Sequence, residues 1–259
     1  MEYKTIQLVR EEPVGIIYLN QPESRNALSL QMRDELRLAL ESWAVDAGIK
    51  AIIIGGRGTA FCAGGDLRTM GNFKPAQGRN RMQAVHRLIM TLRNLEKPVV
   101  AAVNGPAFGA GWSLALACDM VVASEKASFS MAFVKVGLVP DCGCMYLLPR
   151  LIGLFKAKEL MMTGRVMDVT EAVNLGLVNK VVPPDQLLDT AMEMARELAQ
   201  GPPLAIGLLK SIVNRAQEID FLTLLEEEAL VQDLCFQTED HREGIRTFFQ
   251  KGKPRFVGR

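Results

Sequence analysis

The sequence has almost no excess of charge of either sign. Its 259 residues carry 30 Lys and Arg against 29 Asp and Glu, which gives a net charge of +1. Without surplus cations, the chain is not expected to bind nucleic acid by neutralising phosphates. Hydrophobic residues make up 49% of the composition. That fraction, combined with the low net charge, excludes an intrinsically disordered chain and predicts a globular protein.

Long hydrophobic runs are also missing. No stretch reaches the roughly 18 apolar residues of a membrane-spanning helix, and the longest candidate, from Pro98, is broken by Asn104 and Gly105. The N-terminal stretch is charged throughout and has no apolar core of about seven residues, so it does not resemble a signal peptide. We therefore expect a cytoplasmic protein of one to two domains that has no membrane partner.

Residues for metal or thiol chemistry are few. The chain has five cysteines, two histidines and no CxxC pair. An odd number of cysteines without a secretory signal predicts reduced thiols, and a zinc site is not expected. Cys62 lies inside a glycine-rich loop, but no histidine is near it in sequence to activate its thiol, so a nucleophilic cysteine is disfavoured.

Strand-like and helix-like patterns alternate in the first half of the chain. We predict strands at 14–19, 49–54, 98–103 and 120–123, and helices at 28–43, 79–95 and 114–117. This alternation indicates an α/β fold with parallel strands and right-handed crossovers. After about residue 150 helical patterns dominate, and 178–182 fits either a strand or a connector. We expect the α/β core and the helical C-terminal part to pack together. The later helices are predicted at 155–162, 170–175, 185–199, 203–217, 221–237 and 242–251.

Two glycine-rich loops follow two of the predicted strands. They span 55–67 (GGRGTAFCAGGDL) and 104–112 (NGPAFGAGW). Glycine at the end of a parallel strand lets a ligand approach backbone N–H groups, and two such loops can aim two donors at one oxygen as an oxyanion hole. Alternatively, the glycines only permit close packing or a plain turn. Neither loop fits a phosphate-binding or dinucleotide-binding pattern.

Asp141 is an isolated acid in the otherwise apolar stretch 129–144. Burial of its carboxylate would raise its pKa and suit it to act as a general base near neutral pH. The alternative is that the segment Pro140–Gly143 is an ordinary turn, in which Asp141 caps the following helix.

Several co-linear motifs resemble the crotonase family, the enoyl-CoA hydratase/isomerase superfamily. The resemblance covers essentially the whole chain, and it implies repeated ββα units that form a spiral core with the CoA and active sites over residues 1–200. It also implies an α-helical oligomerisation region over 201–259 that forms a homotrimer, commonly a dimer of trimers. The motifs are LNQPESRNAL (19–28), GTAFCAGGDL (58–67), KPVVAAVNGPAFGAGWSLALACDM (97–120), MTGRVMDVTEAVNLGLVNKVVP (162–183) and DHREGIRTFFQKGKPRF (240–256).

The resemblance further implies an acyl-CoA thioester substrate and specific positions for its contacts. The thioester oxygen would lie between the N–H groups of Gly65 and Ala110. The chemistry would need no metal and no separate cofactor, because coenzyme A is part of the substrate. Arg25 would contact a CoA phosphate or be an ordinary exposed arginine. The remaining implied CoA contacts are Ala63, Asp66 and Leu67 at the adenine end, with Phe248 and Lys251 supplied from the same or a neighbouring subunit.

The sequence departs from the family where its hydratases use two glutamates. Ser113 and Phe133 occupy those positions, so hydration is expected to be poor. Asp141 instead occupies a position used by family isomerases, and SFSMAFVKVGLVPDCG (128–143) resembles the isomerase of bacterial phenylacetate degradation. We therefore expect an isomerase that shifts a 3-enoyl-CoA double bond to 2-enoyl-CoA, with Asp141 as acid and base.

Other functions stay open at this stage. A 1,2-epoxyphenylacetyl-CoA isomerase would use the same groups on a ring substrate, which Phe133 and Trp112 would line if they are not core residues. A weak enoyl-CoA hydratase is a second alternative. A non-catalytic RNA- or CoA-binding relative is a third, and the balanced charge of the chain disfavours its RNA-binding form.

Overall fold

The computed structural model describes residues 3–71, 74 and 76–259. Its main sheet has six strands in the order β1-β2-β3-β4-β6-β9, and a second sheet has three in the order β5-β7-β8. In the main sheet β1 is antiparallel to β2 and the other neighbours are parallel. The main-sheet strands are β1 (Ile6–Glu11), β2 (Val14–Leu19), β3 (Ala51–Gly56), β4 (Val99–Val103), β6 (Met120–Ser124) and β9 (Lys180–Val182).

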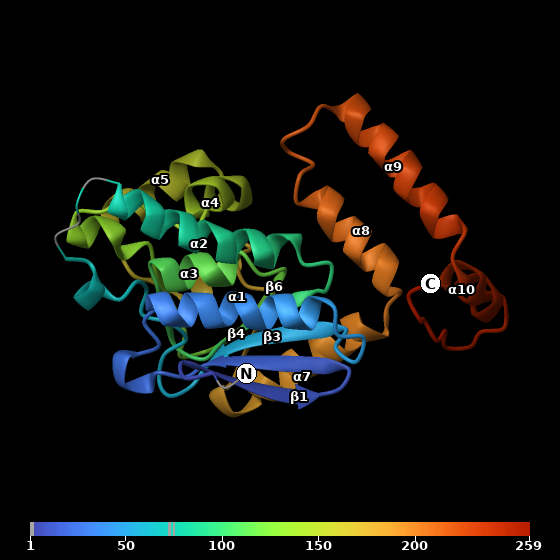
Figure 1. Ribbon diagram of the computed structural model, residues 1–259, viewed down its shortest axis with the longest axis horizontal. Coiled ribbons are helices and arrows are strands. Elements are labelled where there is room, and N and C mark those ends of the chain that lie inside the picture. Colours follow the sequence, from blue (N-terminus) through green and yellow to red (C-terminus); the bar gives the residue numbers. More distant parts are fainter. Residues whose placement is uncertain (1–2, 72–73, 75) are drawn as a thin grey trace.

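Both faces of the main sheet are covered by helices. Helix α1 (Leu30–Ala44) packs against α2 (Gln77–Asn94) on one face, and α7 (Leu187–Gln200) crosses β2, β3, β4 and β6 on the other (Figure 1). Side chains of β3 alternate between the two cores: Ile52 and Ile54 join the core that contains α1 and α2, whereas Ile53 joins the α7 side. This burial on both faces explains why the central strands are continuous apolar runs rather than alternating patterns.

The strand order brings the two glycine-rich loops to one edge of the sheet. Strands β3 and β4 are parallel neighbours, and one loop leaves the C-terminal end of each. Such an edge is where open α/β sheets bind ligands. The second loop forms β5 (Pro106–Phe108) and runs into α3 (Ala110–Leu116). Beside it lie β7 (Ser128–Ser130), which pairs with β5, and β8 (Met167–Asp168), which pairs with β7.

The predicted elements agree with the structure best where apolar runs are long. The strand predicted at 14–19 is β2, and those at 98–103 and 120–123 overlap β4 and β6. The expectation of parallel strands is confirmed for the four predicted strands. The edge strand β1, which has several exposed side chains and pairs antiparallel to β2, was not predicted. The very short strands of the small sheet were not predicted. Neither was α4 (Cys144–Ile152), a short helix with Pro149 inside it. The remaining core helices are α5 (Leu154–Thr163) and α6 (Val169–Asn174).

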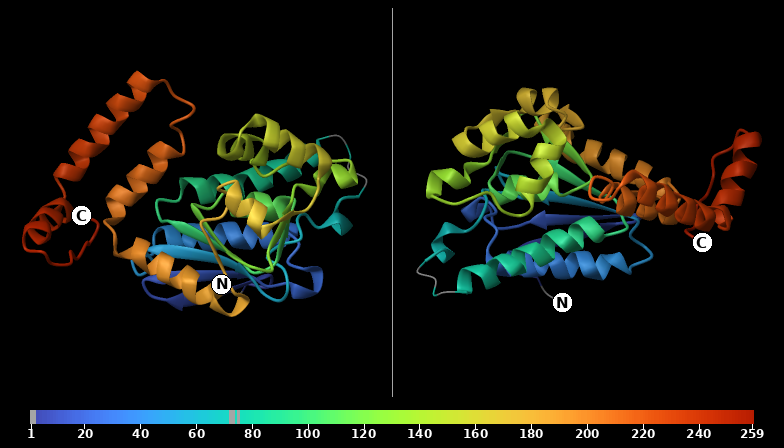
Figure 2. Two further views of the ribbon diagram at one scale, coloured as in Figure 1. Left: turned by 180° about the vertical axis from the view of Figure 1, so that it is seen from behind. Right: turned by 90° about the horizontal axis from the view of Figure 1, so that it is seen from above.

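Residues after Gln200 form a helical arm. It consists of α8 (Pro203–Val213), α9 (Phe221–Phe236) and α10 (Glu239–Phe249). Figures 1 and 2 show α9 and α10 projecting beyond the core. No side chain of α9 is buried. The expectation that the C-terminal part packs on the core is therefore wrong for α9 and α10, because the apolar side chains that gave them helical patterns face solvent in this single chain.

The arm is nevertheless tied to the core by several hydrogen bonds, two of which lie far apart in the sequence. The Nζ of Lys210, in α8, donates to Asp119 Oδ2 at 2.7 Å, and the Nζ of Lys50 donates to the carbonyl oxygen of Phe256 at 3.2 Å. Whether 1–200 and 201–259 fold as separate units stays a prediction. Within the described ranges, no helix is both long and apolar enough to cross a membrane.

Candidate active site

The two glycine-rich loops are packed directly against each other. The N–H of Phe108 donates to the carbonyl oxygen of Cys62 at 2.9 Å, and the N–H of Cys62 donates to that of Pro106 at 3.2 Å. A Cβ on Gly111 would overlap Cys62, whose own Cβ would be 2.7 Å away. Glycine at 111 therefore permits close packing. Burial raises the pKa of the Cys62 thiol to about 12, which removes it as a nucleophile.

This packing leaves two backbone donors close together. Gly64 has φ of +102°, and the position of a Cβ on it would be 3.7 Å from the Ala110 nitrogen. Ala110 is the first residue of α3, so its N–H has no acceptor within the helix. In the part of the chain that the structure describes, neither this N–H nor that of Gly65 donates a hydrogen bond to the backbone. The loops thus combine the two roles considered for them, close packing and a pair of available N–H groups.

Both donors line one cavity of about 510 Å³. Eight of the ten predicted site residues line it, although they come from four separate segments of the chain. The cavity therefore brings the glycine loops and the segment around Asp141 together. The eight are Arg25, Ala63, Gly65, Asp66, Leu67, Ala110, Phe133 and Asp141.

Asp141 lies in a tight turn at the wall of this cavity. The next two residues, Cys142 and Gly143, have φ of 55° and 77°. Helix α4 begins at Cys144 with Gly143 as its N-cap and no side-chain cap, so Asp141 is not the capping residue that the alternative interpretation required. Its Oδ1 is buried and has no hydrogen-bond partner among the described residues. Burial raises the pKa of Asp141, and a hydrogen bond with Cys142 and the charge of Arg33 oppose this shift.

The other two carboxylates that line the cavity have different surroundings. Asp66 accepts hydrogen bonds from the Arg68 backbone N–H at 3.1 Å and from its Nε at 2.9 Å, and this pairing lowers the pKa of Asp66. Glu23 is exposed on the short helix Pro22–Ser24. Asp141 is thus the lining carboxylate with both a raised pKa and a free, buried oxygen, as a general base requires.

The two positions at which family hydratases carry glutamates lie in different surroundings here. Ser113 is fully buried in α3, and its hydroxyl donates to the carbonyl oxygen of Gly109 at 3.1 Å. Phe133 lines the cavity, and its ring lies 3.7 Å from the position of a Cβ on Gly109. Trp112, a candidate ring contact, packs in the core against Phe129, with ring centroids 4.2 Å apart, so the pocket-lining alternative is wrong for it.

The loop that carries Arg25 is hydrogen-bonded to the first glycine-rich loop. Arg25 is exposed, and its carbonyl oxygen accepts from the N–H of Ala63 at 2.9 Å. The neighbouring Asn26, which sequence reasoning missed, is fully buried and donates from Nδ2 to the carbonyl oxygens of Arg57 and Ala60, at 2.8 and 2.9 Å. An asparagine beside a predicted turn was a usable signal, because asparagine tolerates positive φ and bonds to backbone.

Arg33 was also missed. It projects from α1, is 3% exposed, and has no hydrogen-bond partner for Nε or Nη1 among the described residues. Its Nη2 lies 3.6 Å from the position of a Cβ on Gly65. Helical spacing carried a signal, because Arg33 is three residues before Leu36 and seven before Leu40, on the face predicted to be buried.

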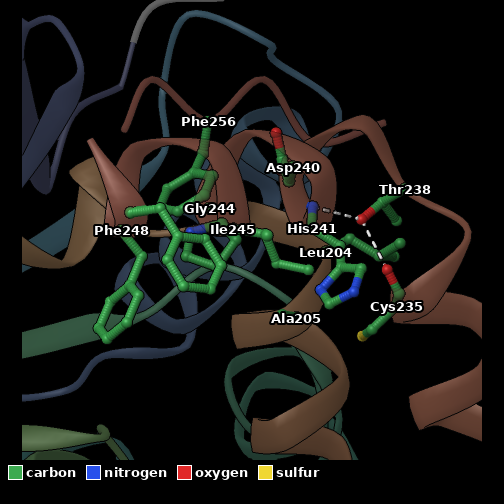
Figure 3. Close-up of a pocket in the computed structure, with 12 residues that line it drawn as sticks. Leu204, Ala205, Cys235, Thr238, Asp240, His241, Gly244, Ile245, Phe248 and Phe256 are labelled. Atoms are coloured by element: carbon green, nitrogen blue, oxygen red, sulfur yellow. Dashed lines mark hydrogen bonds between the residues drawn. The ribbon is translucent and has the colours of Figure 1, made fainter. Parts of the chain in front are cut away.

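Phe248 and Lys251 are not near this cavity in the single chain. Phe248 lines a second, largely apolar cavity of about 610 Å³ between α8, α9 and α10 (Figure 3). Lys251 follows α10 with φ of 53°. Figure 1 shows α10 at the opposite end of the molecule from the segment around residue 70. Within one chain the structure therefore does not bring these two residues to the predicted CoA contacts.

Metal-binding clusters are not found in the described part of the chain: no three His, Cys, Asp or Glu side chains gather as ligands there. The residues that converge on the site are instead two backbone N–H groups and one buried carboxylate. That set suits proton transfer next to a carbonyl group whose oxygen gains negative charge.

The fold and this site define a class of acyl-CoA enzymes. A family model described as Enoyl-CoA hydratase/isomerase matches residues 10–259. The chain belongs to this family, and its fold is the crotonase fold with a helical C-terminal part. The resemblance seen in the sequence motifs is confirmed.

Curated relatives of the chain carry both hydratase and isomerase names. It is 35% identical over 260 residues to the crotonyl-CoA hydratase of Syntrophomonas wolfei, with 100% of each chain covered. It is 38% identical over 253 residues to the 1,2-epoxyphenylacetyl-CoA isomerase of Escherichia coli, covering 96% of this chain and 97% of that one. Most of the similar proteins are named hydratases.

Solved structures give the same assignment. An enoyl-CoA hydratase subunit from Geobacillus kaustophilus superposes with a TM-score of 0.94 at 38% identity, with 100% of both chains covered. An enoyl-CoA hydratase/isomerase from Cupriavidus metallidurans has the same TM-score and identity, over 100% of this chain and 98% of that one.

Proposed function

We propose that this protein is an enoyl-CoA isomerase that converts 3-enoyl-CoA thioesters to 2-enoyl-CoA thioesters. The observation that carries the proposal is the position of Asp141. Its buried, unpartnered carboxylate oxygen belongs to the same cavity as the N–H groups of Gly65 and Ala110. A base and a pair of donors are the groups that enolate formation from a thioester needs.

The reaction needs one carboxylate and no added group. Asp141 takes a proton from the α-carbon of the 3-enoyl-CoA, and the electron pair moves onto the thioester oxygen, which accepts hydrogen bonds from Gly65 and Ala110. Loss of one such donor typically costs about 3 kcal/mol of transition-state stabilisation. Asp141 then returns the same proton to the γ-carbon, which leaves the double bond conjugated with the thioester. Both carbons lie on one face of a short allylic unit, so a small movement of the carboxyl group serves both.

Hydration is disfavoured by the two residues that replace the hydratase glutamates. A hydratase must hold and activate a water molecule, which in this family takes two carboxylates. Ser113 is buried and bonded to its own helix, and Phe133 presents an aromatic ring to the cavity. Neither side chain can act as an acid or a base near neutral pH.

A panel of three substrates tests the proposal. Turnover of trans-3-hexenoyl-CoA should exceed hydration of crotonyl-CoA by at least about 100-fold in kcat/KM, the typical contribution of one general acid–base group. Hydration equal to or faster than isomerisation would overturn the proposal. The third substrate, 1,2-epoxyphenylacetyl-CoA, tests the second candidate function described next.

The second candidate is isomerisation of 1,2-epoxyphenylacetyl-CoA to a seven-membered ring ether, the oxepin. Two observations favour it: the ring of Phe133 lines the cavity, and a relative of that name is 38% identical. Turnover of the epoxide well above that of 3-hexenoyl-CoA would make this ring reaction the principal activity.

We further propose that the chain forms a homotrimer, or a dimer of trimers, through its arm. The support is α9, which has no buried residue yet carries large exposed side chains. Among them Leu222 and Leu230 are 73% and 68% exposed. In such an assembly a neighbouring copy would bring Phe248 and Lys251 to the CoA site. Light scattering during gel filtration should give a multiple of three chains for the wild type and a smaller mass for Leu230→Glu. A monomeric wild type would contradict this.

A further inference from the structure

Arg33 is a buried cation whose donors have no hydrogen-bond acceptor in the described structure. It is 3% exposed, and both Nε and Nη1 are unpartnered. An arginine side chain remains charged at any physiological pH. A buried charge without a partner is strongly unfavourable, so natural proteins pair it or use it to bind a ligand. None of the described residues supplies such a pairing for these two atoms.

The guanidinium lies beside Gly65, one of the residues that line the cavity. Its Nη2 is 3.6 Å from the position of a Cβ on Gly65, and the methyl group of Met70 lies against the same α-carbon. Gly65 and Met70 both line the cavity, whereas Arg33 lies immediately behind them. Methionine is flexible and adapts to a changed neighbour, so Met70 is the side chain that can move aside for a ligand group reaching Arg33.

Charged groups of both signs lie near Arg33. The charge of Arg33 lowers the pKa of Arg81, second to burial, which places two cations near each other. Asp66 and Asp141 are the carboxylates that act on Arg81, and Asp66 is already paired with Arg68. The charge of Arg33 also acts on Asp141, whose Oδ1 has no hydrogen-bond partner among the described residues.

We propose that Arg33 binds a carboxylate carried by the acyl group, so that the natural substrates are CoA thioesters of dicarboxylic acids. This inference rests on the proposed function, because it uses the same cavity and the same orientation of the thioester. A carboxylate would accept hydrogen bonds from the open donors of the guanidinium, an arrangement stronger than bonds between neutral groups. The acyl group would then be fixed at both ends, by the two N–H groups at its thioester and by Arg33 at its carboxylate.

Equilibrium binding of two matched thioesters tests this assignment. Glutaryl-CoA and pentanoyl-CoA differ only in a terminal carboxylate in place of a methyl group, and neither has a double bond to isomerise. By calorimetry, the wild type should bind glutaryl-CoA at least about tenfold more tightly. The Arg33→Met variant should lose this preference while binding pentanoyl-CoA normally. Arg37→Met is the matched control on the same helix, since Arg37 is paired with Glu41, and it should keep the preference.

Thermal stability separates recognition from a structural role. Replacing a buried, unpaired charge by an apolar side chain of similar length is expected to leave the melting temperature of Arg33→Met unchanged or higher. Equal binding of the two thioesters by the wild type would overturn the inference, as would a preference that survives in Arg33→Met. Equal loss of affinity for both thioesters in Arg33→Met would also overturn it, because Arg33 would then act on the shared thioester part or on the fold.

The inference and the proposed function fail in different ways. If the wild type isomerises trans-3-hexenoyl-CoA but binds both saturated thioesters equally, the isomerase assignment stands and the carboxylate site is wrong. If it binds neither thioester and isomerises nothing, both are wrong.

Discussion

Gly111 and Cys62 are in such close contact that the two glycine-rich loops leave no room for a Cβ at position 111. A Cβ on Gly111 would be 2.7 Å from the Cβ of Cys62 and 2.8 Å from its sulfur. Gly111 follows Ala110, and Cys62 precedes Gly65 by three residues. The spacing of the two N–H donors is therefore fixed by packing between these residues.

Substitution Gly111→Ala should separate the loops and damage the donor pair. We expect kcat/KM for isomerisation to fall by at least about 100-fold, as when one oxyanion donor is lost, together with about 1–3 kcal/mol of stability from overpacking. Urea unfolding and initial rates measure the two effects. Gly78→Ala is the control, since no described atom beyond its chain neighbours and the backbone of α2 lies within 4 Å of its Cβ position, and it should keep full activity. Full activity in Gly111→Ala would show that the loop spacing is unimportant.

The pH dependence of isomerisation should report Asp141. Burial raises the pKa of its carboxyl group, and the ionised form is the one that accepts the substrate proton. Activity should be constant at high pH and fall as the pH drops through a value above about 3.9, the ordinary pKa of aspartate. Measurement of kcat/KM between pH 4 and 9 locates this limb. An acid limb at or below the ordinary value would indicate that Asp141 is not the group that titrates.

Ser113→Ala should change isomerisation by less than about twofold. The Ser113 hydroxyl bonds to the carbonyl oxygen of Gly109 within α3 and does not line the cavity, so removing it affects no group that contacts substrate. Loss of such a neutral hydrogen bond is expected to reduce stability by about 1 kcal/mol. Steady-state rates with trans-3-hexenoyl-CoA measure the change in isomerisation. A drop of 100-fold would assign Ser113 a catalytic role that this structure does not give it.

Lys210→Met should destabilise the protein because it leaves Asp119 without its cation. The Lys210 Nζ donates to Asp119 Oδ2 at 2.7 Å and to the carbonyl oxygen of Lys97 at 3.1 Å. Burial raises the pKa of Asp119, and Lys210 opposes that shift. Breaking a buried pair typically costs about 3 kcal/mol or more. Arg215→Met breaks the more exposed pair with Glu227 and should cost under about 1 kcal/mol. If urea unfolding gave the two variants equal losses in free energy of unfolding, this prediction would be contradicted.

Sequence reasoning predicted the parts of this fold that depend on burial within one chain. The run at Val14–Leu19 is buried at all six positions, so its pattern alone gave the strand. The motifs led to Gly65, Ala110 and Asp141, which line one cavity. Periodicity does not show two- or three-residue strands such as β8, because they contain hardly more than one repeat of the two-residue strand pattern.

The residues that sequence reasoning missed or misplaced depend on contacts between distant segments. Arg33 looks like one of several charged residues of α1; its spacing places it on the buried face, but its lack of a partner is visible only in the packed structure. Phe248 and Lys251 lie in the arm, and within one chain they do not reach the cavity that contains Asp141. Trp112 is the last residue of the second glycine-rich loop yet packs against Phe129, because α3 is buried at every position and its side chains face the core on all sides.

The central claim is that Asp141 transfers the proton, and Asp141→Asn tests it most directly. Asparagine has nearly the same shape but cannot accept a proton, so isomerisation of trans-3-hexenoyl-CoA should fall by a factor of about 100 to 10,000. The melting temperature at pH 7 should not fall, because a buried carboxylate with a raised pKa gives less stability as pH rises through that pKa. An Asp141→Asn variant that isomerises at the wild-type rate would contradict the account.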